Sequence, residues 1–229
     1  MGRRSKNIAK LEIYEVFRRF IGSGVQKVTV SGLIEETGMN RKTFYNHFSS
    51  QDELAAWGYR FDLANALKAD NEEADLIYLD SDPYGFHDLP CYTRNPSSTF
   101  SLDQTRFIES FNKPFSDHEP YYHALFRSAY GEPLCRYLVE MLQQLLLEDI
   151  EYFLKGRKMP MEAKTYIASL FAEGIVRQTV DSLIYDAIAW AKISTIAPIN
   201  NLVHESMLHL VEAYQAERSS TYFSKLRTL

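Results

Sequence analysis

The chain has 229 residues, 45% of them hydrophobic, and a formal net charge of −5. This length is enough for one large or two modest domains. No apolar run is long enough to span a membrane and no signal peptide begins the chain, so we expect a cytoplasmic protein without a membrane partner. Cys91 and Cys135 form no C-x-x-C pair and have no metal-site spacing, which fits packing roles in a reducing compartment.

The charge is distributed unevenly along the chain. Residues 1–50 hold nine Lys/Arg against four Glu, which gives +5, and residues 51–229 hold sixteen against twenty-six acidic residues, which gives −10. Such asymmetry is typical of a basic segment that binds nucleic acid attached to an acidic body.

Three short helices are predicted in the basic segment. The first, 8–21, has a broad apolar face and ends at Gly22-Ser23-Gly24. A second helix, 29–36, runs into the turn Thr37-Gly38-Met39-Asn40, and a third, 41–48, follows directly. Helix, Gly-containing turn and helix form the plan of a helix-turn-helix, whose second helix enters the DNA major groove.

The helix 41–48 has two chemically distinct faces. Phe44 and Phe48 are four residues apart and therefore share a face that must be buried. The remaining side chains are polar and point outward, and Asn40 is a good N-cap. Arg and Lys pair with guanine, Asn pairs with adenine, and hydroxyls hold phosphates, so this face suits DNA. The alternative is an ordinary solvated helix face.

Residues 8 to 60 resemble the DNA-reading domain of tetracycline-repressor-like (TetR-type) transcription regulators. The residues that match the family's sequence pattern are Thr29-Val30, Gly38, Thr43-Phe44-Tyr45-Asn46-His47-Phe48 and Asp52-Glu53-Leu54. The resemblance implies a homodimer that reads a palindromic double-stranded DNA operator and a body that binds a small-molecule effector. The candidate DNA-binding residues are Thr29, Asn40, Arg41, Lys42, Thr43, Tyr45, Asn46 and His47.

A capping box, Ser50 to Glu53, predicts the start of a long helix at residue 51 that fades near 70–73. In the TetR-type family this helix links the DNA head to the body. We therefore divide the chain into a helix-turn-helix domain, 1–50, and an effector-binding and dimerisation domain, 51–229.

Residues 81–98 are the main irregular segment, with three of the eight prolines and several aromatic residues. A loop of this length is mobile or functional. It is either a lid over a ligand cavity or an aromatic loop docked on the body.

From residue 102 the pattern is helical, with predicted helices at 102–111, 119–130, 134–154, 162–193 and 201–217. No strand alternation or repeat is evident, so the fold class is all-α, a helix-turn-helix head on a helical bundle. The last two helices lie where the TetR-type fold forms its dimer interface, and we expect Ala172 and Leu183 there.

Enzyme motifs are missing from the sequence: it has no Gly-rich phosphate loop, no G-x-S-x-G and no H-E-x-x-H. We predict no catalytic residue, no cofactor and no metal; Asp117, His118, Glu119 and His123 are better read as a helix start than as a metal site, and His204 and His209 receive no role. Helix periodicity nominates the following pocket residues, each also compatible with simple packing: Phe107, Phe111, Tyr122, Phe126, Tyr137, Met141, Phe171, Ile175 and Gln178.

The sequence therefore predicts a sequence-specific transcription regulator, a ligand-responsive repressor in its most specific form. An activator or a ligand-independent DNA binder on the same fold is the first alternative. A dimeric helical module that docks proteins is the alternative from a different class.

Overall fold

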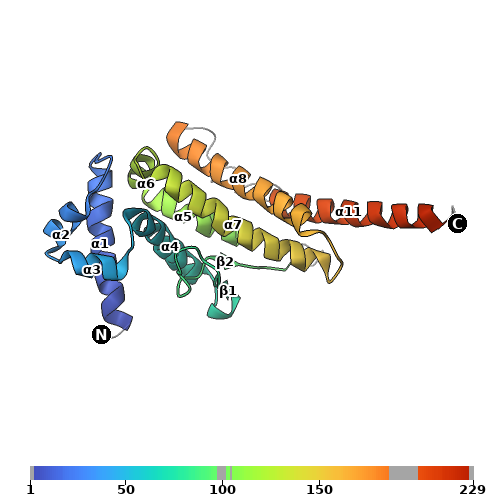
Figure 1. The fold of residues 1–229 in the computed structure, drawn as a ribbon, viewed down its shortest axis with the longest axis horizontal. Helices are drawn as coiled ribbons and strands as arrows, with labels where there is room; N and C mark the ends of the chain where they lie inside the picture. Colours follow the sequence, from blue (N-terminus) through green and yellow to red (C-terminus); the bar gives the residue numbers. More distant parts are fainter. Residues whose placement is uncertain (1–2, 97–101, 104, 186–200, 227–229) are drawn as a thin grey trace.

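The computed structural model describes residues 3–96, 102–103, 105–185 and 201–226. A three-helix head lies at one end of an elongated molecule, a helical body follows it, and the last helix projects beyond the body at the other end (Figure 1). The all-α prediction is confirmed, because most of the described residues are helical and they contain only one two-stranded sheet.

The head consists of α1 (Arg3–Gly22), α2 (Val30–Thr37) and α3 (Arg41–His47). Its core is apolar and aromatic, with Phe17 from α1, Leu33 from α2 and Phe44 from α3 all buried. Gly38 ends α2 with φ 66°, a left-handed conformation that glycine adopts without a Cβ clash. This glycine lets the chain reverse between α2 and α3.

Helix α4 (Gln51–Asp70) connects the head to the body and is buried over most of its length. The predicted cap is present: Ser50 Oγ accepts the Glu53 amide at 3.1 Å, and Glu53 in turn accepts the Ser49 amide at 2.6 Å. Gly58 lies against the Tyr14 ring of α1, and a Cβ at this position would be 2.1 Å from Tyr14 Cε2. The close approach of α1 and α4 therefore requires a glycine.

The body contains α5 (Thr105–Asp117), α6 (Glu119–Phe126), α7 (Gly131–Leu154), α8 (Met161–Tyr185) and α11 (Leu202–Leu226). Helices α7 and α8 lie side by side, and α5 packs on α4 (Figure 1). The predicted helix 102–111 begins later and is longer than expected, and the helix predicted at 119–130 ends at Phe126. The predicted end of the helix 162–193 lies outside the described residues.

The expectation that no strand occurs is wrong in one place. After a 3-10 turn, η1 (Glu73–Asp75), strand β1 (Leu76–Ile77) pairs antiparallel with β2 (Tyr92–Thr93). Two residues are too few to show the alternation by which a strand is recognised in sequence. The hairpin-like pair closes the base of the irregular loop.

The loop between β1 and β2 is docked on the body by a buried ion pair. Arg60 of α4 is fully buried and donates to Asp82 Oδ2 at 2.5 Å and to the Leu89 carbonyl at 2.5 Å. Tyr137 of α7 donates to the same Asp82 oxygen at 2.8 Å. Of the two interpretations of this segment, the docked loop agrees with the contacts.

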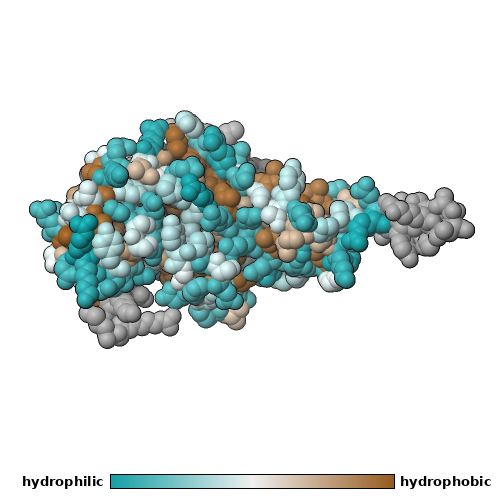
Figure 2. All heavy atoms as spheres, viewed as in Figure 1, coloured by the Kyte–Doolittle hydropathy of each residue, from teal (hydrophilic) through white to brown (hydrophobic). Residues whose placement is uncertain are grey.

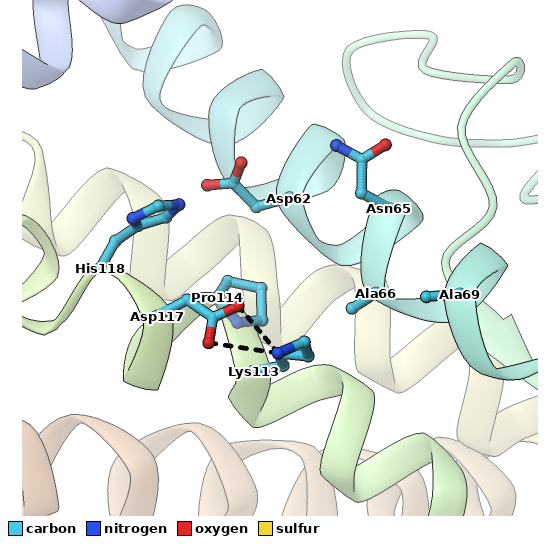
Figure 3. A pocket seen from close by; sticks show the side chains of 8 residues that line it. All are labelled: Asp62, Asn65, Ala66, Ala69, Lys113, Pro114, Asp117 and His118. Carbon is cyan, nitrogen blue, oxygen red and sulfur yellow. Dashed lines mark hydrogen bonds and ion pairs between the residues drawn. The ribbon is translucent and has the colours of Figure 1, made fainter.

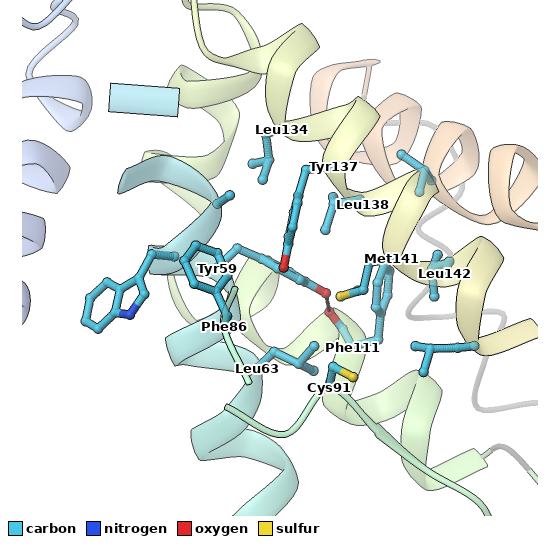
Figure 4. Packing of buried hydrophobic residues seen from close by; sticks show 14 of the residues in the cluster. Tyr59, Leu63, Phe86, Cys91, Phe111, Leu134, Tyr137, Leu138, Met141 and Leu142 are labelled. Atoms are coloured by element: carbon cyan, nitrogen blue, oxygen red, sulfur yellow. Dashed lines mark hydrogen bonds between the residues drawn. The ribbon is translucent and has the colours of Figure 1, made fainter. Parts of the chain in front are cut away.

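Aromatic rings fill the body between α4, α5 and α7 (Figure 4). Tyr59 stacks on Phe115 with ring centroids 5.1 Å apart, and its hydroxyl donates to the Phe111 carbonyl at 3.2 Å.

Within the described ranges, no helix is long and apolar enough to cross a bilayer.

Candidate DNA interface and body cavities

The two predicted faces of α3 are present in the structure. Phe44 and Phe48 are 1% exposed and pack into the head, whereas Tyr45 is 49% exposed. Arg41, Lys42 and Asn46 are also exposed. A polar surface with two cations, an amide and a phenol therefore stands outward on a helix that is anchored by two phenylalanines.

The two helix starts of the motif are held by side-chain caps. Asn40 Oδ1 accepts the Thr43 amide at 2.8 Å and the Thr43 hydroxyl at 3.2 Å. Thr29 Oγ1 accepts the Gly32 amide at 3.1 Å at the start of α2. The oxygens of Asn40 and Thr29 are thus engaged within the head, and these residues fix how α2 and α3 begin.

Two surface contacts lie on the head, one of them within the outward face of α3. The Arg41 guanidinium carbon lies 5.9 Å from the centre of the Tyr45 ring, one helical turn away. An ion pair of 2.6 Å between Arg19 and Glu36 ties α1 to α2 at the surface. His47, at the last position of α3, is half-buried and is therefore less accessible than the exposed side chains of this helix.

A first cavity of about 210 Å³ lies between α4 and α5 and is open to solvent (Figure 3). Asp62 on its wall accepts the hydroxyls of Tyr14 at 2.8 Å and Tyr122 at 3.0 Å, and burial raises the pKa of this carboxyl despite both hydrogen bonds. His118, also on the wall, accepts a 3.0 Å hydrogen bond from Arg18 of α1. This polar cluster joins the head to α4 and α6.

A second cavity, of about 10 Å³, lies among α5, α7, α8 and α11 and is almost entirely apolar. Its volume corresponds to about one water molecule. Three of the predicted pocket residues, Phe107, Phe111 and Ile175, line it. The other lining residues are Tyr92, Ile108, Leu142, Leu145, Leu146, Val203 and His204.

The remaining predicted pocket residues are not gathered around one space. Tyr122 belongs to the Asp62 cluster, and Tyr137 binds Arg60 and Asp82. Phe126 and Met141 are buried in the core, and Phe171 is half-buried. Gln178 is exposed and lines neither of the two cavities. Helix periodicity identifies the buried face but not where packing leaves a cavity.

A buried polar cluster beside the small cavity was not predicted from the sequence. Asp149 of α7 is fully buried and accepts Arg94 Nε at 2.7 Å and His204 Nε2 at 2.9 Å. Tyr92 donates its hydroxyl to the same carboxylate. The sequence contains one signal for this cluster: the acidic residue Asp149 interrupts the apolar face of the helix 134–154. Its partners could not be predicted, because they lie 55 or more residues away in sequence.

The position of the helix-turn-helix agrees with a comparison to known families. Residues 17–56 match the model of "Bacterial regulatory proteins, tetR family", which covers the end of α1, all of α2 and α3 and the start of α4. A comparison with curated proteins gives no match. The head, with its outward polar helix, is therefore similar to the DNA-binding domain of tetR-family regulators, and this match supports a DNA-binding transcription regulator.

Proposed function

We propose that the protein is a homodimeric repressor that reads a palindromic operator with α3 of each protomer and releases it when an effector binds the body. The observation that supports DNA binding is the exposed polar face of α3. Residues 1–50 would form the reading head and residues 51–229 the effector-binding and dimerisation unit. The resemblance to TetR-type regulators supports the repressor role and the effector response.

Apolar side chains exposed on α8 and α11 support the homodimer. Tyr166 is 71% and Leu170 is 54% exposed on α8, and Leu202 and Leu210 are exposed on α11. Hydrophobic residues form a band over α8 (Figure 2), and α11 leaves the body as a projecting helix (Figure 1). A lone helix in water is marginally stable, so a second copy that packs on α8 and α11 is the expected cover.

The predicted interface residue Ala172 has a different position from the one expected. Its side chain is fully buried within the protomer, so a charge there would disrupt the body rather than separate two copies. Leu183 is half-buried against the same core. Leu170 is the better position for a test because it has little packing to lose within the protomer.

The test is a gel-shift assay with the DNA upstream of the protein's own coding sequence, combined with sedimentation. Leu170→Glu should be monomeric at micromolar concentration, keep the melting temperature of the wild type and bind the operator poorly. Ala74→Glu is the matched control, since it adds the same charge at an exposed site in η1.

The outcomes separate the classes of function. A sequence-selective shift that weakens with salt supports a DNA reader, because counterions are released from the phosphates. A folded wild type that shifts no DNA selectively would favour the protein-docking module. A wild-type monomer that binds the operator tightly would contradict the two-headed mechanism.

A further inference from the structure

We infer that Lys10 of α1 and Phe86 of the loop between β1 and β2 are positioning residues for DNA reading, because their contact fixes the angle of the head on the body. The inference rests on the proposed two-headed mechanism. It adds the attachment that determines how the two recognition helices are presented to a palindrome.

The first observation is a cation that three aromatic rings share. Lys10 is half-buried, and its Nζ lies 5.4 Å from the centre of the Phe48 ring, directly after α3, and 5.6 Å from that of Trp57 in α4. The centre of the Phe86 ring lies 6.0 Å from the same nitrogen. Ring faces attract an ammonium group electrostatically, and more strongly where water is excluded. Lys10 therefore joins the recognition helix, the connecting helix and the loop.

Phe86 is held in place by the body. Its side chain is 3% exposed and meets the ring of Tyr137 of α7 edge to face, with centroids 6.0 Å apart (Figure 4). Asp82 Oδ1 accepts the Phe86 amide at 3.3 Å. The other oxygen of Asp82 is bound by Arg60 and Tyr137. The body therefore determines where the loop presents this ring to Lys10.

A second attachment holds the head toward the other end of α1. The Val28 amide donates to the Tyr130 hydroxyl at 2.9 Å, and this hydroxyl donates to the Val28 carbonyl at 2.8 Å. The Asp62 cluster also contacts the second half of α1. Lys10, by contrast, contacts Phe86 from the first half of that helix. One attachment alone leaves the head free to tilt about it, whereas two attachments fix its angle.

The angle of the head matters for a palindrome and not for one half-site. Two recognition helices must enter successive major grooves, about 34 Å apart, at the same time. A head that tilts spends part of its time at other spacings, so the apparent affinity for the palindrome falls with the competent fraction. A single head binds a single half-site at any angle of the body behind it. Loss of the contact between Lys10 and Phe86 should therefore lower the ratio of palindrome affinity to half-site affinity.

The experiment uses a palindromic operator that the wild type selects from a pool of random DNA duplexes, and a half-site made by scrambling one arm of it. Lys10→Met keeps the aliphatic stem and removes the charge, and it should lower the affinity ratio about fivefold. Lys10→Arg keeps a cation and should restore the ratio. Lys27→Met is the matched control, since it removes the same charge from an exposed site of the head and any lost phosphate contact weakens both DNAs.

Phe86→Leu should lower the same ratio, and combining it with Lys10→Met should lower the ratio no further, because both changes remove one contact. Phe107→Leu is its control, since it removes a ring that is 4% exposed and contacts Tyr92 and Phe111 within the body. A wild-type ratio in Lys10→Met overturns the inference. A wild type that selects no operator contradicts the proposed function instead.

Hydrogen exchange tests the contact without DNA. In Lys10→Met, exchange of the Tyr84 and Phe86 amides, which Asp82 accepts, should become about fivefold faster because the loop has lost its hold on the head. The Thr43 amide in the cap of α3 should keep its rate. Unchanged exchange in the loop overturns the inference. An equal rise at Thr43 would mean that Lys10 stabilises the whole head, and it overturns the positioning role as well.

Discussion

In the head, the polar residues Arg41, Lys42 and Asn46 stand exposed on α3 above an apolar core. In the body, by contrast, Arg60 and Asp149 are fully buried and hold other segments of the chain. An exposed polar side chain contributes little to the stability of the fold and is available to a partner such as DNA. A buried one must be paired, and removing its partner destabilises the fold. Substitutions in the two regions should therefore separate function from stability.

The largest effect is expected at the buried ion pair of the body. Asp82→Ala leaves the fully buried Arg60 without its carboxylate, and we expect the free energy of unfolding to fall by about 3–5 kcal/mol in chemical denaturation. The double variant Arg60→Met, Asp82→Leu removes both charges and should recover most of that stability. A single variant as stable as the wild type would show that the loop is not held by this pair.

Next comes the apolar anchor of α3. Phe44→Ala should cost about 3 kcal/mol, the lower end for such a truncation, because the short helix can settle into the space. Tyr45→Phe should stay within about 0.5 kcal/mol of the wild type but bind the operator more weakly, since the hydroxyl is expected to hold a phosphate. Equal losses of stability in thermal melts of the two variants would mean that the faces of α3 are assigned wrongly.

A smaller effect is expected at the cap of α3. Asn40→Ala removes the acceptor of the Thr43 amide and should destabilise the head by about 1 kcal/mol. Asn40→Asp keeps the cap and serves as the control for folding. If Asn40→Ala weakens operator binding without any change in the denaturation midpoint, Asn40 acts on DNA directly and not through the helix start.

The smallest change in stability is expected for the exposed cations of α3. Arg41→Ala and Lys42→Ala should each leave the free energy of unfolding within about 0.5 kcal/mol of the wild type. Each should reduce the slope of log affinity against log salt by about one for every phosphate that the variant no longer neutralises. Lys68→Ala, exposed on α4, should leave both quantities unchanged. A much lower melting temperature for either α3 variant would show that the substituted residue stabilises the fold, as the buried polar residues of the body do.

The helix-turn-helix could be predicted from the sequence because its determinants are local. The caps at Thr29, Asn40 and Ser50 act on amides three residues away, and Phe44 and Phe48 define a face by their spacing. The boundaries of α2 and α3 agree with the predicted helices to within one residue. Helix edges in the body, such as the start of α5 at Thr105, were displaced further.

Only the tertiary structure decided the buried polar pairs and the cavities. Arg60 meets Asp82 across 22 residues of sequence, and Asp149 meets His204 across 55, because helices from distant parts of the chain pack together. Helix periodicity predicts which face of a helix is turned inward, and it correctly placed Phe107 and Ile175 on buried faces. It does not state how closely neighbouring helices approach, and that distance determines whether an inward side chain fills the core, as Met141 does, or borders a cavity.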